Sequence, residues 1–184
     1  MSGASFTFRV TGSDQIERQM AALVAAGEDL TEFSQAFGLI LESNTLDRFD
    51  RETAPDGSAW KKSARAKAEG GKTLTDTARL KGSIASAGNA HEIRVGSNVV
   101  YAAIHQLGFN GSQKVGAHKR RITQAFGRRL QSPVEVIVPN FTRTMNMPAR
   151  AYLGIGAEDR DDGAALFTDL FAGKAPGLFD GGQP

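Results

Sequence analysis

The sequence predicts an α+β fold, in which a mostly antiparallel sheet packs against helices and carries a long basic loop or arm. Three observations predict it: helical periodicity near both ends, short alternating segments between them, and 21 glycines with six prolines that supply turns. We expect a single domain over residues 1–172, with a basic extended excursion over 109–148, and a flexible tail over 173–184.

The N-terminal part is expected to contain a strand and two helices. Alternating apolar residues predict a half-buried strand over 6–10, and a cap at Ser13 or Asp14 predicts a helix to about Ala26. The strongest helix is predicted from a cap at Thr31 to the region before Pro55, because a proline ring clashes with a continuing helix. Its apolar residues recur at helical spacing: Phe33, Phe37, Ile40 and Leu41.

A turn and a basic segment follow this helix. The segment "APDG" has proline second and glycine fourth, which is typical of a tight turn, and Trp60 after it is expected to be a packing anchor. The basic run 61–72 is predicted to be a mobile loop. Residues 74–84 are predicted to form a short helical segment, capped by Thr75, with Leu80 and Ile84 one turn apart.

The remaining elements are expected in the order hairpin, helix, excursion and helix. Residues 83–97 predict a hairpin around Gly88-Asn89. The segment "VVYAAIHQLG" predicts a short helix that stops at Gly108, with an apolar stripe of Val100, Ile104 and Leu107. Within the excursion, 134–139 predicts a strand. Tyr152-Leu153 is expected to pack against the sheet. The acidic segment that starts at Glu158 predicts a closing helix, in which Leu166 and Leu170, and likewise Phe167 and Phe171, lie one turn apart.

Composition excludes several classes of protein. There is no cysteine, which excludes disulfides, thiol catalysis and thiolate metal sites. No apolar run approaches the length of a membrane span, and the first ten residues lack a secretory pattern, so we expect no membrane partner. Charge is uneven: the balance is −5 over 1–50, +4 over 51–110, +7 over 111–150 and −4 over 151–184. The basic middle could meet nucleic acid, the acidic part of an identical neighbour, or solvent.

No catalytic or cofactor motif is present. Tyr101 and His105 share a helix face, but the possible partners Ser97, Ser112 and Asp76 lie in no recognisable motif. The three histidines lack metal-ligand spacing, "DRDDG" does not complete a calcium loop, and "EGGKTLT" lacks the spacing of a phosphate loop. We therefore predict no enzyme activity, no metal and no cofactor. The cations that could contact DNA or another subunit are Lys114, Lys119, Arg120, Arg121, Arg128 and Arg129.

Four stretches together carry a family resemblance: "RFDRETAPDGSAWKKSA", "LTDTARLKGSI", "RVGSNVVYAAIHQLG" and "MPARAYLGIG". In this order they resemble the virion morphogenesis family of tailed phages, which includes tail completion proteins and the G-type morphogenesis proteins of Mu-like phages. The resemblance spans roughly residues 30–172, and the basic insertion "AHKRR…AFGRR" is similar to that of Mu-like members. One departure is Ala78, where members often have glycine.

The resemblance implies a structural virion protein, not an enzyme. It implies a homo-oligomeric ring at the tail end or the head–tail junction, assembled in the host bacterial cytoplasm. The implied partners are tail or neck proteins, such as the tail tube or connector, with non-specific contact to channel DNA. A DNA-contacting packaging or head-completion protein that uses residues 114–129 is the alternative. Residues that match the family pattern would define the fold or an interface: Pro55, Gly57, Trp60, Arg79, Leu80, Ser83, Tyr101, His105, Gln106, Gly108, Arg150, Leu153 and Gly154.

Overall fold

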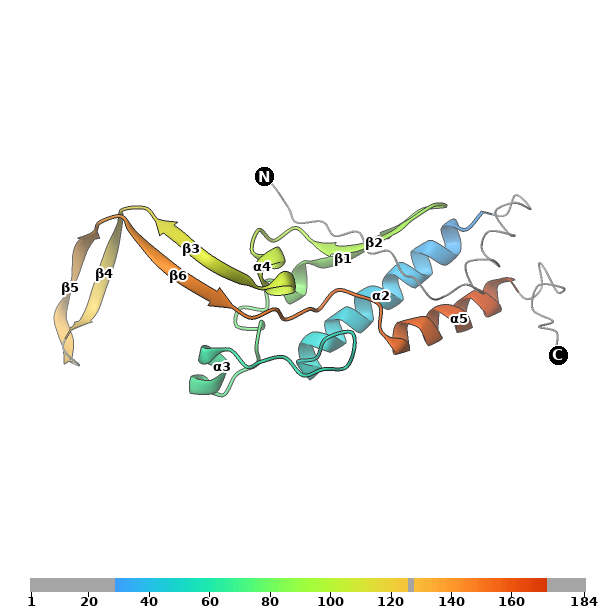
Figure 1. Cartoon of the computed structure of the whole chain (residues 1–184), viewed down its shortest axis with the longest axis horizontal. Coiled ribbons are helices and arrows are strands. Elements are labelled where there is room, and N and C mark those ends of the chain that lie inside the picture. Colours follow the sequence, from blue (N-terminus) through green and yellow to red (C-terminus); the bar gives the residue numbers. More distant parts are fainter. Residues whose placement is uncertain (1–28, 126–127, 172–184) are drawn as a thin grey trace.

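The protein has an α+β fold with a body and a projecting arm. The computed structural model describes residues 29–125 and 128–171. The body holds the helices and the hairpin β1–β2, and the arm extends from it as two successive β-ribbons (Figure 1). The predicted strand over 6–10, the first helix and the tail over 173–184 lie outside the described residues. In the described part of the chain the predicted sheet is divided into three antiparallel two-stranded ribbons.

Helix α2, Thr31–Arg51, is the longest helix of the body and confirms the strongest predicted helix. Thr31 is not its side-chain cap: the Thr31 backbone N–H and hydroxyl both donate to the Asp29 carboxylate, at 2.9 and 2.6 Å. The helix also ends before Pro55, because Glu52 adopts a left-handed conformation with φ 56° and its N–H bonds to the Arg48 carbonyl.

The turn after α2 fixes the tryptophan in the core. The Gly57 N–H donates to the Ala54 carbonyl at 2.9 Å, which confirms the predicted turn. Trp60 is buried, its ring meets Phe49 edge to face, and its Nε1–H donates to the Ala151 carbonyl at 2.8 Å. Trp60 is therefore a packing anchor whose polar atom is satisfied.

Residues 61–84 differ from the prediction in two ways. The basic run contains helix α3, Ala64–Glu69, whose first turn is capped by the Ser63 hydroxyl, so the predicted mobile loop is wrong there. The predicted helix over 74–84 is also wrong: only a 3₁₀ turn, η1, forms over Lys81–Ser83. Leu74 and Ala78 have φ values of 63° and 54°, which a right-handed helix cannot contain.

The predicted hairpin is confirmed. Strand β1, Ile84–Gly88, pairs antiparallel with β2, Ile93–Ser97, and helix α2 covers one face of the pair (Figure 1). Gly88 permits a close approach, because a Cβ there would lie 2.4 Å from the carbonyl carbon of Ser34.

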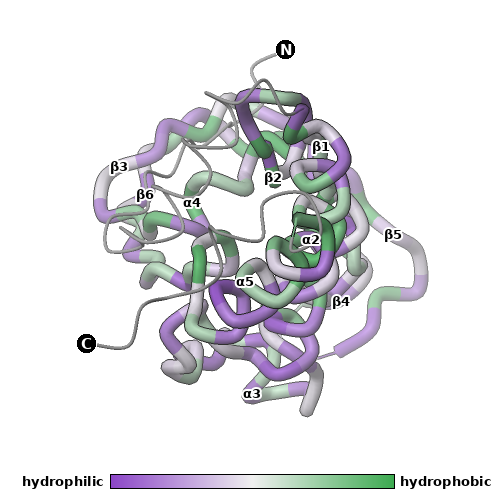
Figure 2. The backbone as a smooth tube through the Cα atoms, turned by 90° about the vertical axis from the view of Figure 1, so that its right-hand side faces the viewer, coloured by the Kyte–Doolittle hydropathy of each residue, from purple (hydrophilic) through white to green (hydrophobic). Residues whose placement is uncertain are grey.

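Helices α4 and α5 complete the body. Helix α4, Ala102–Leu107, confirms the predicted helix, but the predicted apolar stripe is wrong: Val100 and Leu107 are 76% and 67% exposed, and the buried residues are Ala102 and Gln106. Helix α5, Ala157–Phe171, lies beside α2. Viewed along the long axis of the molecule, hydrophobic and hydrophilic stretches alternate along both helices (Figure 2).

Two apolar clusters hold the body together. One joins Leu30 and Phe33 of the α2 region to Phe167 and Phe171 of α5, with the Phe33 and Phe167 rings edge to face. The other joins α2, the tryptophan turn, the hairpin, α4 and the segment after the arm. Its buried members are Phe49, Trp60, Leu80, Ile84, Val99, Ala102, Tyr152 and Leu153.

The basic excursion predicted over 109–148 is an arm made of four β-strands. Strand β3, Phe109–Val115, pairs with β6, Phe141–Met147, to form the proximal ribbon. Strand β4, His118–Ala125, pairs with β5, Arg128–Val138, to form the distal ribbon, which contains most of the predicted strand over 134–139. The distal ribbon bends away from the proximal one (Figure 1). The sequence understated these strands because exposed ribbons need no continuous apolar face.

Candidate functional site

The segment from Arg150 to Gly156 leads the chain back from the arm to the body. The side chain of Gln106, on α4, holds this segment by hydrogen bonds. The Gln106 Oε1 accepts hydrogen bonds from the backbone N–H groups of Tyr152 and Leu153, at 2.9 and 3.0 Å. Its Nε2 donates to the Leu153 carbonyl at 2.7 Å. Tyr152 is buried, and burial raises its pKa to about 12. The side-chain amide of Gln106 thus provides hydrogen-bond partners for buried backbone groups of the return segment.

A buried ion pair fixes the end of the same segment. The Arg48 guanidinium pairs with the Asp159 carboxylate and also donates to the carbonyls of Tyr152 and Gly154, at 3.2 and 2.9 Å. Asn44 donates to Asp159 as well. The acidic run at the start of α5 was predicted only to complement the helix dipole, so the buried role of Asp159 was missed. The one hint in the sequence was Arg48, a charged residue on the face of α2 that packs into the core.

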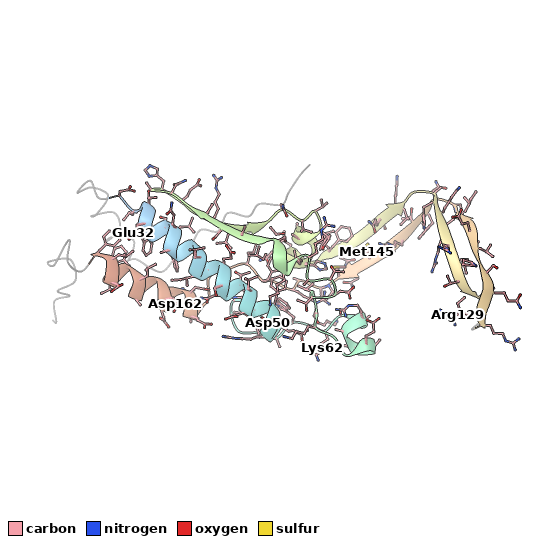
Figure 3. The ribbon with its side chains drawn as sticks, turned by 180° about the vertical axis from the view of Figure 1, so that it is seen from behind. Glu32, Asp50, Lys62, Arg129, Met145 and Asp162 are labelled. Atoms are coloured by element: carbon pink, nitrogen blue, oxygen red, sulfur yellow. The ribbon has the colours of Figure 1, made fainter. Side chains whose placement is uncertain are left out.

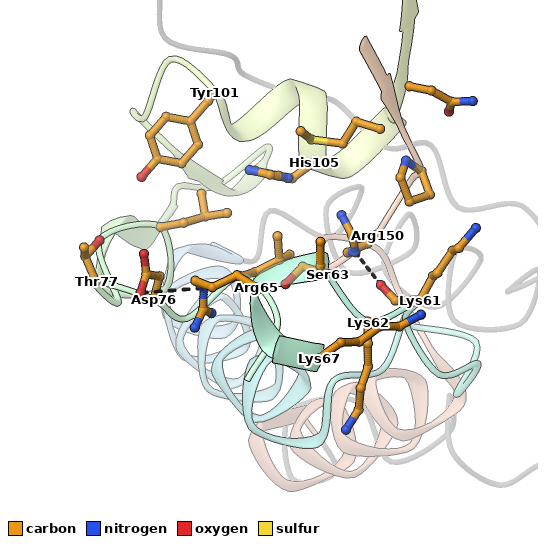
Figure 4. Close-up of a pocket in the computed structure, with 16 residues that line it drawn as sticks. Lys61, Lys62, Ser63, Arg65, Lys67, Asp76, Thr77, Tyr101, His105 and Arg150 are labelled. Carbon is orange, nitrogen blue, oxygen red and sulfur yellow. Dashed lines mark hydrogen bonds and ion pairs between the residues drawn. The ribbon is translucent and has the colours of Figure 1, made fainter. Parts of the chain in front are cut away.

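A basic cleft opens beside the root of the arm, between α3, α4 and β6. Its volume is about 730 Å³, and it is lined by cationic residues of the α3 region, by Tyr101 and His105, by Arg150, and by apolar side chains (Figure 4). Among the described residues of its wall, the single acid is Asp76, which lies 3.6 Å from the Arg65 guanidinium. Arg65 also donates to the Lys72 carbonyl. We call this the basic cleft. Its cationic residues are Lys61, Lys62, Arg65, Lys67 and Arg150.

Two groups of the basic cleft are incompletely paired. Arg150 is 6% exposed, and its Nε donates to the Lys61 carbonyl at 2.7 Å, but no carboxylate pairs with it in the described ranges. The Nδ1 of His105 is buried without a hydrogen-bond partner in the same part of the chain. Burial, followed by the charge of Arg150, holds the pKa of His105 below its ordinary value, and burial lowers the pKa of Arg150.

The described residues of the cleft form no catalytic triad. The rings of Tyr101 and His105 meet edge to face at 5.7 Å, as their helical spacing predicted. Ser97 is buried and bonded to Ser83, Ser112 lies on the arm, and Asp76 is held by Arg65. No cluster of histidine, aspartate and glutamate suited to a metal ion occurs among residues 29–125 and 128–171.

The other predicted site residues fall into three places. Trp60, Gln106 and Leu153 are buried in the body, and Arg79 is exposed before η1. Gly108 forms the root of the arm with φ 76°, where a Cβ would lie 2.8 Å from the Ala149 nitrogen. The predicted cations all lie exposed on the arm, with Arg129 near its tip (Figure 3): Lys114, Lys119, Arg120, Arg121, Arg128 and Arg129.

Comparison with known families gives the class of the protein. The family model described as the phage virion morphogenesis family matches residues 12–166. The chain belongs to the phage virion morphogenesis family. This agrees with the resemblance carried by its sequence motifs, and it indicates a structural role in phage virion assembly. Searches of curated proteins and of solved structures returned no match.

The virion morphogenesis match extends from residue 12 to residue 166, a range that includes the arm and most of the body. The family indicates a virion-associated protein of a structural class. In the described ranges, no helix combines the length and the apolar character needed to cross a bilayer. The basic cleft and the arm are thus candidate interfaces of an assembly protein.

Proposed function

We propose that this virion assembly protein acts in tail completion or head–tail joining, as one subunit of a homo-oligomeric ring. The ring would sit at the tail end or in the neck, contacting the tail tube or the connector, after assembly in the host cytoplasm. Family membership supports the general role. The projecting arm supports the ring, because its described residues extend away from the body (Figure 1) and include the exposed rings of Phe109 and Phe141.

The proximal ribbon is amphipathic, and this observation carries the proposal. Pairing places Phe109 opposite Met147, Gly111 opposite Met145 and Val115 opposite Phe141, so these residues share one face. The same face also carries the pair Gln113 and Arg143, whose side chains are hydrogen-bonded to each other at 2.6 and 3.0 Å. The other face is polar, with the pairs Asn110/Asn146, Ser112/Thr144 and Lys114/Thr142. We call these the apolar and the polar face of the proximal ribbon.

An isolated ribbon of this kind is weakly stable alone. Two strands without a packed face are marginal in water, and their outer edges present unpaired backbone groups. Phe109 and Phe141 are 36% and 45% exposed. Seating the apolar face on a neighbouring subunit would bury these rings and order the arm. A subunit that reaches onto its neighbour in this way makes a head-to-tail contact, which can close a ring.

The test is assembly of particles that carry substitutions on one face of the ribbon. Replacing Phe141 and Met145 by serine removes apolar area from the apolar face, while Thr142→Ser with Thr144→Ser is the matched control on the polar face. We expect the first pair to abolish infectious particles while the purified chain keeps its thermal unfolding. Electron microscopy of particles locates the missing component. Infectious, complete particles from a phage that lacks this chain would overturn the proposal.

A second candidate function is contact with channel DNA, and the distal ribbon favours it. The distal ribbon carries Lys119, Arg120 and Arg121 on β4, and Arg128 and Arg129 at the start of β5. The acid of this ribbon is Glu135, which lies 4.0 Å from Lys119. Cations that contact phosphates release counterions, so affinity falls with salt. Replacing the five cations by glutamine is expected to reduce retention of DNA and its salt dependence. Unchanged retention would exclude the distal ribbon as a phosphate contact.

A further inference from the structure

The basic cleft contains a positive charge for which the described residues supply no counter-charge. Arg150 is buried, and no carboxylate pairs with it among residues 29–125 and 128–171. Lys61, Lys62 and Lys67 add exposed cations around it (Figure 4). A buried guanidinium is costly unless it is paired, so the cleft is suited to an anionic group from outside the subunit.

The shape and lining of the cleft favour the side chains of a protein over DNA. A duplex presents its phosphates on a convex surface, which cannot bring them to a guanidinium that is buried within a cleft. The cleft also has apolar walls, formed by Leu74, Met147 and Pro148, which suit the aliphatic part of a peptide segment. Carboxylate groups would meet Arg150 and the lysines in charge-assisted hydrogen bonds.

A matching acidic surface lies elsewhere on the same chain. Asp161 and Asp169 of α5 are exposed, and neither forms an ion pair within the described part of the structure. Glu158, near them on α5, has only an exposed contact with Arg51 at 3.4 Å. Helix α5 and the α3 side of the cleft occupy different ends of the body (Figure 1), and Asp50 lies between Asp162 and Lys62 (Figure 3). The acidic helix therefore cannot fill the cleft of its own subunit.

We propose that the basic cleft binds the acidic face of α5 from a second copy of this chain, so that neighbouring copies join head to tail. This rests on the proposed ring, and adds the surfaces through which subunits recognise each other. The cleft and helix are different patches, as a head-to-tail contact requires. Opposite charges on the two patches would also steer the encounter and disfavour wrong partners.

Charge exchange across the interface tests the proposal. One variant carries Lys61→Glu and Lys62→Glu, a second carries Asp161→Lys and Asp169→Lys, and a third carries all four changes. Each is supplied to a phage lacking the chain. Because like charges at an interface cost several kcal/mol, we expect each pair alone to lower the infectious titre about 100-fold and the combination to restore it. Arg94→Glu, an exposed reversal on β2, is the control, and unchanged thermal unfolding shows that each variant folds.

Disulfide trapping supplies a second measurement, since the chain contains no cysteine of its own. Lys62→Cys with Asp161→Cys is expected to give covalent ladders of this chain in oxidised particles, whereas Lys62→Cys with Glu92→Cys should give none. Reversals without effect on titre would overturn the cleft as an interface. If the single reversals lower the titre, the combined variant does not restore it and no covalent ladders form, the cleft binds another virion protein and the proposed contact with a second copy is overturned. Both results leave the proposed function standing if particles without the chain remain defective.

Discussion

The side chain of Gln106 is hydrogen-bonded to both backbone polar groups of Leu153. Its Nε2 donates to the Leu153 carbonyl at 2.7 Å and its Oε1 accepts the Leu153 N–H at 3.0 Å. The Arg150 N–H donates to the His105 carbonyl at 2.7 Å, one residue earlier on α4. Helix α4 therefore holds the chain where it returns from the arm, and it fixes Arg150 at the basic cleft.

Substitution of Gln106 should loosen this return segment. Gln106→Met keeps the approximate size but leaves two buried N–H groups and one carbonyl without their partner. Since each unsatisfied buried group costs about 1–3 kcal/mol, we expect a loss of about 3 kcal/mol or more in the free energy of unfolding. Urea denaturation measures it. Leu107→Met, on the exposed side of the same helix, is the control and should change little. If Gln106→Met were as stable as the natural chain, water would be satisfying the backbone groups that the Gln106 amide bonds.

The approach of α2 to the hairpin can be tested at a glycine. An added Cβ at Gly88 would lie 2.4 Å from the carbonyl carbon and oxygen of Ser34, so helix or strand must move. We expect Gly88→Ala to lower the free energy of unfolding by about 1–3 kcal/mol. Gly96, in the partner strand, has open space around its added Cβ, and Gly96→Ala is the matched control. A similar effect of both substitutions would contradict tight packing of α2 on the hairpin.

The sequence predicted elements that depend on local patterns and missed those that depend on distant partners. Helix α2 and the hairpin follow from periodicity and turn residues, and both are confirmed. The stripe assigned to α4 was wrong because the amide of Gln106 has backbone partners nearly 50 residues away, which no local pattern contains. Likewise, the residues around Arg150 come together only through the fold, so the basic cleft had no sequence signal beyond scattered lysines.

Ala78 offers a prediction in which a substitution stabilises the protein. Its φ of 54° is left-handed, a conformation that costs an L-residue about 1–2 kcal/mol and glycine almost nothing. Part of the gain is offset by the greater freedom of glycine in the unfolded chain. We therefore expect Ala78→Gly to raise the free energy of unfolding by about 0.5–1 kcal/mol, measured in urea. Ala68→Gly within α3 should instead lower it, because that residue is helical. Destabilisation by Ala78→Gly would contradict the strained backbone.

The pH dependence of stability should report the environment of His105. Burial and the charge of Arg150 lower its pKa below the ordinary 6.5, so between the two values the unfolded chain binds more protons than the folded one. The stability that His105 contributes is therefore fully present above pH 6.5, its ordinary pKa, and is lost as the pH falls from there to the lower pKa of the folded chain. The carboxylates with lowered pKa values, Asp50 and Glu52 among them, contribute in the same direction but below their ordinary values of 3.8 and 4.5.

Urea denaturation at about pH 7.5 and about pH 5.5 separates these contributions, because that interval lies above the carboxylate range. The titratable groups that line the cleft with His105 are Arg150, the α3-region cations, Tyr101 and Asp76, and the carboxylate of Asp76 is paired with Arg65. We expect His105→Gln to lose less stability than the natural chain between the two pH values. His118→Gln, an exposed change on the arm, is the control. Equal losses in the natural chain and His105→Gln would show that His105 titrates as it does in the unfolded state.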